Sequence, residues 1–467
     1  IDAFTVSILF KGCKSQRTPA PGEFDRALSL LSRHTIKLDE VLVNVILEAC
    51  VALRDTRRLQ SVLALLKRNG WDLPKRCNSN TYAALIKAYG SANQVRKAAE
   101  LFDDITKKQG IVPSEYVYAQ MIDVLVTSGD LKRALELFTE MRRIHRDRFS
   151  SNGFAIAYAM IVRGHAQQKD AKRALQCYEE MKDLGVPVGV VVLNTLIDAC
   201  CRVGDMARSD ALLADMAKFD VSPDLITYST LIKGYCVKGD LDRALELFGA
   251  MRRKGIKPDA IVFNSLLDGC ARKEMPMLCE QVIEDMIAAG VQPSNYSASI
   301  LIKLYGRLQD LTAAFKVLDE MPQKFGFRPN AAVYTTLMSS CTWNGRMDLA
   351  MSLRERMKQD GQVPDEKTYA TLLRGATRYG QCEHIVSLLW EAADHGQRSR
   401  KLLLETEVVQ NALQTIMKRR AWAQRGGDEV LQQLRSAGYD VLRPTEMKSH
   451  QGYNERPRRE GRQGALA

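Results

Sequence analysis

The chain has 467 residues, which is too long for one hydrophobic core unless the protein is built from modules. A composition of 46% hydrophobic and 26% charged residues argues against a disordered, collagen-like or membrane-embedded chain, and no uncharged apolar run approaches the roughly 18 residues that span a bilayer. Lys and Arg outnumber Asp and Glu by 67 to 55, and this net charge of +12 favours polyanionic partners without identifying one.

A period of about 35 residues organises the sequence from its start to residue 400. Methionine, alanine and proline keep this period in phase, and the methionines that do so are Met141, Met181, Met216, Met251, Met286, Met321 and Met357. In chain order the predicted units are 3–39, 40–78, 79–114, 115–154, 155–189, 190–224, 225–259, 260–294, 295–330, 331–365 and 366–400. They form a predicted array over 1–400, in which Ile144 to Phe154 is expected to be an added loop.

Unit 225–259 shows the internal pattern most clearly. Its apolar residues fall at helical spacing in two blocks, and Gly239 between them can adopt the left-handed conformation that closes a helix. Asp240 is a plausible cap for the second block, which ends near Gly255 and Pro258. Because neither short helix can bury its apolar face alone, the pattern predicts an all-α solenoid of stacked helical hairpins.

Beyond residue 400 the period is lost. Helical patterns at Leu402 to Arg420 and Asp428 to Leu434 predict that 401–442 caps the array, whereas 443–467 has the composition of a disordered basic tail. The sequence begins at Ile1 within a patterned segment, so it carries no information on a targeting peptide. The eleven cysteines include no CxxC pair and are interpreted as reduced packing residues rather than a disulfide framework or a zinc site.

The run TYSTLIKGYCVKGDLDRALELFGAMRRKGIKPD resembles the pentatricopeptide repeat of the P class, and the resemblance extends over about 400 residues. The tetratricopeptide repeat has a similar length but a Trp-x-x-Leu-Gly signature that no unit carries. The resemblance implies a right-handed superhelix that binds single-stranded RNA in a chloroplast or mitochondrion, one base per repeat, as a monomer with no cofactor and no membrane partner. RNA-processing factors or a ribosome are the further partners it suggests.

The resemblance also assigns roles within each unit. The selecting residue, which follows the aromatic position of the first helix, and the closing residue, the last of the unit, face the base edge, while the stacking residue, three places before the selecting residue, sandwiches the base. The implied pairs are Asn194 with Asp224 for U, Ser229 with Asp259 for G, Asn264 with Ser294 for C, Ser299 with Asn330 for A and Thr335 with Asp365 for G, giving a core 5′-UGCAG-3′. The implied stacking residues are Val191, Ile226, Ile261, Tyr296 and the small Ala332.

Other units depart from this pattern. Alanine replaces the selecting residue at Ala83, Ala119, Ala159 and Ala370, so these units should not select a base. The first two units carry Ser7 with Asp39 and Asn44 with Asn78, but their lengths are irregular. An alternative for all the polar pairs is that they only cap helices.

Basic residues recur near the end of the first helix, at Arg202, Arg272, Arg307 and Arg378. They could contact phosphates, or they could be solvated helix ends. No His-x-Glu deaminase motif and no Walker loop occurs, and the last 67 residues contain too few aspartates for a metallonuclease, so we expect no catalysis. The rival function is a protein scaffold or a subunit of an organellar ribosome.

Overall fold

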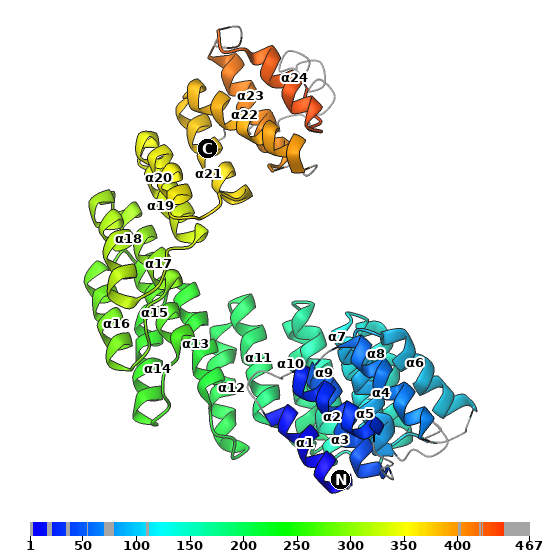
Figure 1. Ribbon diagram of the computed structural model, residues 1–467. Helices are drawn as coiled ribbons and strands as arrows, with labels where there is room; N and C mark the ends of the chain where they lie inside the picture. Colours follow the sequence, from blue (N-terminus) through cyan, green and yellow to red (C-terminus); the bar gives the residue numbers. More distant parts are fainter. Residues whose placement is uncertain are drawn as a thin grey trace, which may run out of the picture. The chain divides into compact units, whose positions relative to one another are not determined.

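The computed structural model describes residues 3–15, 21–33, 38–53, 55–69, 79–108, 112–399, 403–419, 422 and 424–442. All regular elements in these residues are helices, which confirms the predicted all-α solenoid class (Figure 1). The predicted tail 443–467 and the closing residue Asn78 lie outside the described residues. Helices of the described residues include none that is both long and apolar enough to cross a membrane.

The chain divides into two compact units, 1–238 and 239–467. The first contains α1 (Ala3–Ser15), α2 (Pro21–Arg33), α3 (Glu40–Leu53), α4 (Thr56–Arg68), α5 (Ser79–Ser91), α6 (Val95–Asp103) with the π-turn Asp104–Lys108, α7 (Glu115–Thr127), α8 (Leu131–Ile144), α9 (Asn152–Gln167), α10 (Ala171–Asp183), α11 (Val190–Val203), α12 (Met206–Lys218) and α13 (Leu225–Lys238). The second contains α14 (Leu241–Arg253), α15 (Ala260–Arg272), α16 (Pro276–Ala288), α17 (Asn295–Arg307), α18 (Leu311–Phe325), α19 (Ala331–Trp343), α20 (Met347–Gln359), α21 (Glu366–Tyr379), α22 (Cys382–Ser399), α23 (Thr406–Lys418) and α24 (Gly427–Ser436).

Local sequence explains where the helices begin and end. Gly239 has a φ of 87°, in the left-handed region that glycine adopts without strain, so it separates α13 from α14 as the sequence predicts. Asp240 accepts a hydrogen bond from the backbone N–H of Arg243 and caps α14, and Asp130, Asp170, Asp205 and Asp310 cap their helices in the same way.

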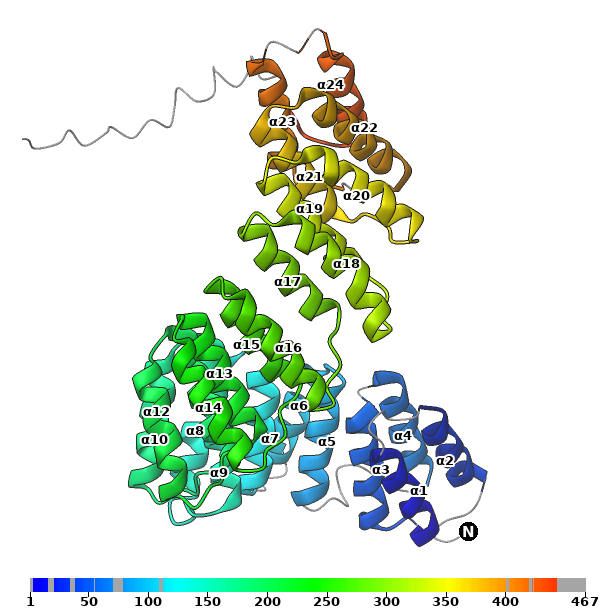
Figure 2. The same ribbon diagram turned by 90° about the vertical axis from the view of Figure 1, so that its left-hand side faces the viewer.

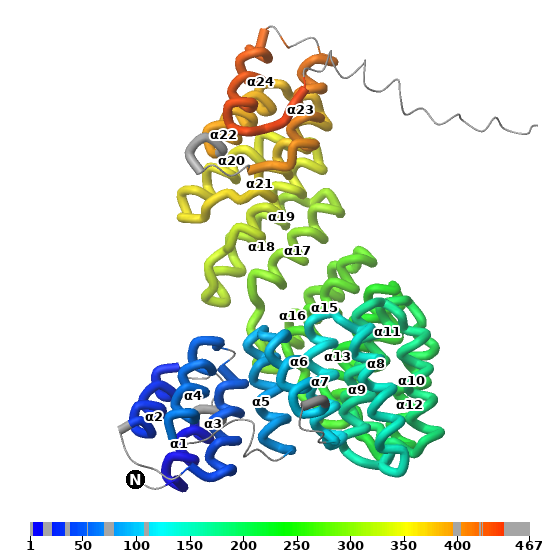
Figure 3. The backbone as a smooth tube through the Cα atoms, turned by 90° about the vertical axis from the view of Figure 1, so that its right-hand side faces the viewer, coloured from blue at the N-terminus to red at the C-terminus, as the bar shows by residue number. Residues whose placement is uncertain are grey.

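Within each compact unit the first helices of consecutive repeats pack directly on one another. In the first unit α5, α7 and α9 form such a series (Figure 3), and in the second unit α17, α19 and α21 do so (Figure 2). The second helix of a repeat packs on its own first helix and on the first helix of the following repeat, as α8 does on α7 and α9. The first helices therefore present a continuous layer to any molecule that lies along them.

Glycine permits some of the tightest approaches within that layer. A Cβ atom at Gly90 on α5 would overlap Cγ2 of Val124 on α7, and one at Gly375 on α21 would lie 2.5 Å from Cγ2 of Thr342 on α19. Both pairs join consecutive first helices. Because each glycine has no side chain, the two helices can approach more closely there than any other residue would permit.

The last two helices bury their apolar faces against the end of the repeat stack. Val409, Leu413 and Ile416 of α23 and Leu434 of α24 belong to the same hydrophobic core as Leu388 of α22. The helical segment predicted from Leu402 begins at Thr406. α23 packs on α21 and α24 packs on α22, and the assignment of 401–442 as a cap of the array stays a prediction.

Candidate nucleic-acid interface

The stacking residues form a series of exposed apolar side chains at the starts of first helices. Val191, Ile226, Ile261 and Tyr296 are 60–63% exposed, although the residue that follows each of them is buried. Ala332 is also exposed but has almost no surface to offer. Apolar side chains at one helix position, repeatedly turned toward solvent, are typical of a surface that contacts a ligand.

Three further residues occupy the stacking position, three places before the selecting position, although they were not assigned from the sequence. Phe4, Val41 and Tyr116 are the second residues of their predicted units, and all three are exposed. Each lies three residues before the selecting position of its unit, so the repeat alignment could have identified them.

One cavity in the first compact unit gathers a complete set of the predicted residues. About 420 Å³ in volume, it is lined by the selecting pair Asn194 and Asp224, by the stacking residues Val191 and Ile226, and by Arg202. These side chains come from α11, α13 and the turn before α13. A flat ring held between Val191 and Ile226 would have its edge toward the amide and the carboxylate.

Hydrogen bonds fix the polar side of this cavity. Asn194 Nδ2 donates to Asp224 Oδ1 at 3.1 Å, and the buried Thr227 hydroxyl lies 2.6 Å from Asn194 Oδ1. Burial acts to raise the pKa of Asp224, but hydrogen bonds from the backbone and side chain of Thr227 and from Asn194 outweigh it, so the pKa lies below its usual value. Asp224 is therefore a carboxylate at neutral pH, and it can only accept hydrogen bonds.

The closing residues also cap helices, as the alternative from the sequence proposed. Asp259 accepts from the backbone N–H groups of Ile261 and Val262, and Asn330 accepts from that of Val333. Ser294 and Asp365 form capping boxes with the residue three places later. Asp259 and Asp365 make these cap contacts through Oδ1, so capping and contact with a base are compatible roles.

The family model of the pentacotripeptide-repeat region of PRORP matches residues 107–277 and 238–401, which together make up more than half of the chain. A pentatricopeptide-repeat model matches 80–109, and a pentatricopeptide-repeat domain model matches 28–92. The chain belongs to the pentatricopeptide-repeat family.

Curated relatives of this pentatricopeptide-repeat protein come from Arabidopsis thaliana. It is 27% identical over 331 residues to a mitochondrial pentatricopeptide repeat-containing protein, covering 71% of this chain and 68% of that protein. It is 24% identical over 319 residues to the small ribosomal subunit protein mL103, covering 68% and 67%. A chloroplastic pentatricopeptide repeat-containing protein is 29% identical over 182 residues, and the chain spans only 22% of that protein's length.

Solved structures of similar fold include the maize pentatricopeptide repeat protein PPR10, with 19% identity, a TM-score of 0.44, and coverage of 97% of this chain and 75% of that one. Yeast Rmd9p in complex with a 16-nucleotide target RNA has 11% identity, a TM-score of 0.41, and coverage of 81% and 89%.

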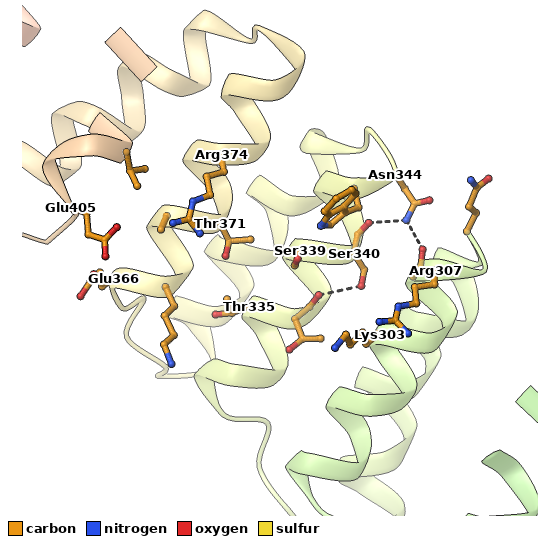
Figure 4. Close-up of a pocket in the computed structure, with 17 residues that line it drawn as sticks. Lys303, Arg307, Thr335, Ser339, Ser340, Asn344, Glu366, Thr371, Arg374 and Glu405 are labelled. Carbon is orange, nitrogen blue, oxygen red and sulfur yellow. Dashed lines mark hydrogen bonds between the residues drawn. The ribbon is translucent and has the colours of Figure 1, made fainter. Parts of the chain in front are cut away.

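A second cavity lies in the other compact unit of the pentatricopeptide-repeat protein, along α17, α19 and α21 (Figure 4). It has a volume of about 920 Å³ and contains the selecting residue Thr335 together with Trp343. Cationic and hydroxyl side chains share its wall, and those labelled in Figure 4 include Lys303, Arg307, Arg374, Ser339, Ser340 and Thr371. The carboxylates of Glu366 and Glu405 also line the cavity, but Lys and Arg outnumber them, so the lining offers positive charge, hydrogen-bond donors and an aromatic face within one space.

Trp343 was not assigned from the sequence. It occupies the place in unit 331–365 that Arg307 occupies in unit 295–330, its side chain is 66% exposed, and the Arg378 guanidinium lies 3.9 Å from its ring centroid. An exposed indole at a position where arginine recurs could have been noticed by aligning the units. The pair provides an aromatic and a cationic surface in contact.

The recurring arginines differ in their partners. Arg202 and Arg272 each pair with an aspartate one turn earlier in the same helix, Asp198 and Asp268, at 2.7 Å. Arg307 donates to the carbonyl of Ala271 at 3.4 Å. Exposed pairs of this kind contribute about 0–1 kcal/mol, so a phosphate could displace the aspartates at little cost. The phosphate role of all four remains a prediction.

The selecting residues of the remaining pairs have different hydrogen-bond partners. Asn264 Oδ1 accepts from the Ser297 hydroxyl at 2.8 Å, and the Thr335 hydroxyl lies 2.9 Å from that of Thr368. The Ser299 hydroxyl instead donates to the Asn295 carbonyl of its own helix at 2.8 Å. Ser229 and Asp259 belong to different compact units, and the Ser229 hydroxyl donates to the carbonyl of Ile226.

Three of the four alanine-bearing repeats bury their selecting position, whereas the fourth, Ala370, is partly exposed and lines the cavity of the second compact unit. Ala83, Ala119 and Ala159 are buried. Near them lies a cavity lined by Asn44 and Gln120, and the Oδ1 and Oε1 atoms of these two side chains are buried without a hydrogen-bond partner among the described residues. Gln120 directly follows Ala119 and was not identified from the sequence.

Proposed function

We propose that this protein binds single-stranded RNA inside an organelle, with one base contacted per repeat. The observation that carries this proposal is the cavity in which Val191 and Ile226 flank Asn194 and Asp224. Two exposed apolar side chains favour a flat aromatic ring between them, and base stacking contributes about 1–3 kcal/mol per base. The amide and carboxylate at the edge supply the hydrogen-bonding groups that distinguish one base from another.

We propose that successive repeats, taken in chain order, bind the RNA bases from the 5′ to the 3′ end. Asn194 with Asp224 would select U, and the four following pairs would select G, C, A and G, giving the core 5′-UGCAG-3′. Support for this order comes from the family membership and from the pairing of an exposed stacking residue with a polar selecting residue in consecutive repeats. The buried Ala83, Ala119 and Ala159 would leave their repeats without base preference.

We propose that the protein acts by covering the RNA to which it binds and not by catalysing a reaction. A bound array would block exonucleases, prevent a hairpin, expose a ribosome-binding site, or assist splicing or end formation. An organellar location is supported by relatives that are named mitochondrial and chloroplastic.

Selection of RNA ligands from a random pool at physiological salt tests the proposal directly. Enrichment of a UGCAG-like core is the expected result, and a selected pool without it would contradict the base assignment. The double substitution Asn264→Thr and Ser294→Asp copies the pair Thr335 and Asp365 of the same chain. At the third core base it should raise the affinity for G relative to C by about tenfold or more. Preferences at the other four bases should stay unchanged and serve as internal controls.

Trp343 allows the stacking and charge contributions to be separated. Trp343→Ala should weaken RNA binding by about tenfold with little change in salt dependence, because a stacking surface releases no counterions. Arg307→Ala should instead reduce the slope of log affinity against log salt by about 0.7. Fluorescence anisotropy titrations at several salt concentrations measure both quantities, and equal slope changes in the two variants would contradict the assignment.

A protein scaffold on an organellar ribosome is the second candidate function. It is favoured by the alignment with the small ribosomal subunit protein mL103 over 68% of this chain, and by repeats whose selecting position is alanine. Sedimentation of the tagged protein with organellar ribosomes after nuclease treatment would support the scaffold. Release by nuclease would favour RNA binding.

A further inference from the structure

We propose that the buried hydroxyl on the third residue of a first helix, at Thr227, Ser297 and Thr368, positions the selecting residue of the preceding repeat and so determines its base preference. This inference rests on the proposed function. Each of the three side chains is fully buried, and none belongs to the selecting, closing or stacking set. A buried hydroxyl must be satisfied by hydrogen bonds, so its partners show what it holds in place.

The three hydroxyls share the same arrangement. Each accepts a hydrogen bond from the backbone N–H of the closing residue, at 3.1 Å from Asp224, 3.3 Å from Ser294 and 3.4 Å from Asp365. Each also lies within 2.9 Å of the polar atom of a selecting residue, namely Asn194 Oδ1, Asn264 Oδ1 and Thr335 Oγ1. The hydroxyl therefore links the selecting and closing residues of one repeat from the helix of the next.

Proton counting fixes the orientation of Asn194. Asp224 is an acceptor only, and the amide nitrogen of Asn194 lies 3.1 Å from its Oδ1. The reverse orientation would place the amide oxygen against a carboxylate oxygen, which is repulsive. Asn194 Oδ1 must then face Thr227, whose hydroxyl lies 2.6 Å from it and 2.9 Å from Asp224 Oδ1, so these two acceptors share the single hydrogen of the hydroxyl. The remaining N–H of the amide stays available as a donor for a base.

Ser297 imposes the same orientation on Asn264 without help from a carboxylate, because the closing residue there is a serine. The Ser297 hydroxyl accepts from the Ser294 N–H and donates to Asn264 Oδ1. A flipped Asn264 amide would leave the hydroxyl hydrogen of Ser297 buried without an acceptor. The outward amide N–H groups match the O2 and ring or exocyclic acceptors of a pyrimidine edge. Both asparagine repeats are those proposed to select pyrimidines.

Repeats without the hydroxyl provide a contrast within the chain. Val333, which carries no hydroxyl, occupies the third position of α19, next to the selecting residue Ser299. The Ser299 hydroxyl donates to the Asn295 carbonyl of its own helix, as the Thr335 hydroxyl does to that of Ala331, but only Thr335 also lies against a buried hydroxyl of the next repeat. Thr81 has the hydroxyl but donates it to Glu40, and Asn44 Oδ1 has no hydrogen-bond partner in the part of the chain that the structure describes. The presence of the hydroxyl and its hydrogen bond to the selecting residue thus vary from repeat to repeat, as expected of a determinant of specificity.

The test compares Thr227→Val with wild-type protein on four RNAs that differ only in the first core base. Wild-type protein should prefer U over purines, and Thr227→Val should reduce that ratio by about tenfold, the value of one hydrogen bond left unmade. Preferences at the other four bases should not change, whereas general structural damage would weaken binding of all four RNAs equally. Thr227→Ser restores the hydroxyl and should restore the preference.

Thr139→Val is the control for the same substitution at an exposed position, where the hydroxyl donates to the Leu135 carbonyl of its own second helix. Should Thr227→Val fail to fold, Ser297→Ala read at the third core base gives the same comparison. A wild-type preference for U that Thr227→Val retains would overturn this inference alone. Absence of RNA binding by the wild-type protein would overturn the proposed function and the inference together.

Discussion

Replacement of Tyr334 by alanine is expected to lower the free energy of unfolding of the second compact unit by about 3–5 kcal/mol. Tyr334 is fully buried in the first turn of α19, within the core that also contains Leu337 and Leu353. Removing its ring would open a cavity between consecutive repeats that close-packed neighbours cannot fill. Urea unfolding followed by circular dichroism measures the change.

Tyr334→Phe separates packing from the hydrogen bond. The Tyr334 hydroxyl donates to the Asp360 carboxylate, and burial together with this hydrogen bond raises the pKa of Tyr334 to about 12. Since Asp360 is half-exposed and can be hydrated, phenylalanine should cost only about 1 kcal/mol. If alanine and phenylalanine had equal effects, the hydroxyl rather than the ring would be the stabilising group.

Gly90→Ala is expected to destabilise the first compact unit by about 1–3 kcal/mol, because the new methyl group would overlap Val124 on the adjacent first helix. The sign is informative, since glycine to alanine within a helix otherwise stabilises by about 1 kcal/mol. Gly249→Ala in α14 is the matched control, because its Cβ would meet only the end of the flexible Arg253 side chain.

A second substitution should rescue the first. Val124→Ala removes the atom that the new methyl group overlaps, and the next contact, with Val124 Cβ, lies at 3.3 Å. The double variant should therefore be more stable than the sum of the single changes predicts, by about 1–2 kcal/mol in a double-mutant cycle. Additive effects would mean that the two helices separate freely and that the glycine does not set their spacing.

The helical hairpins could be predicted from the sequence because their determinants are local. Gly239 and Asp240 end one helix and begin the next through their own backbone and side-chain preferences, and a repeated period makes each such signal visible many times. The family resemblance then placed Val191, Asn194 and Asp224 in one unit, and the structure brings them to one cavity.

What could not be predicted depends on contacts between repeats. The hydrogen bond from Thr227 to Asn194 joins residues 33 positions apart, and its existence depends on side-chain conformations that periodicity does not specify. The close approaches between first helices at Gly90 and Gly375 were not predicted from the sequence. The division after Lys238 has no counterpart in the repeat pattern.

The dual use of the closing residue has a consequence for how such a protein changes its target. Asp224, Asp259, Ser294, Asn330 and Asp365 all begin the helix that follows them. Aspartate, asparagine and serine are nearly equal as helix caps, so exchange among them alters folding free energy by only a few tenths of a kcal/mol. Evolution can therefore rewrite the bases that a repeat prefers while the scaffold stays equally stable, and an engineer can draw on the same three residues.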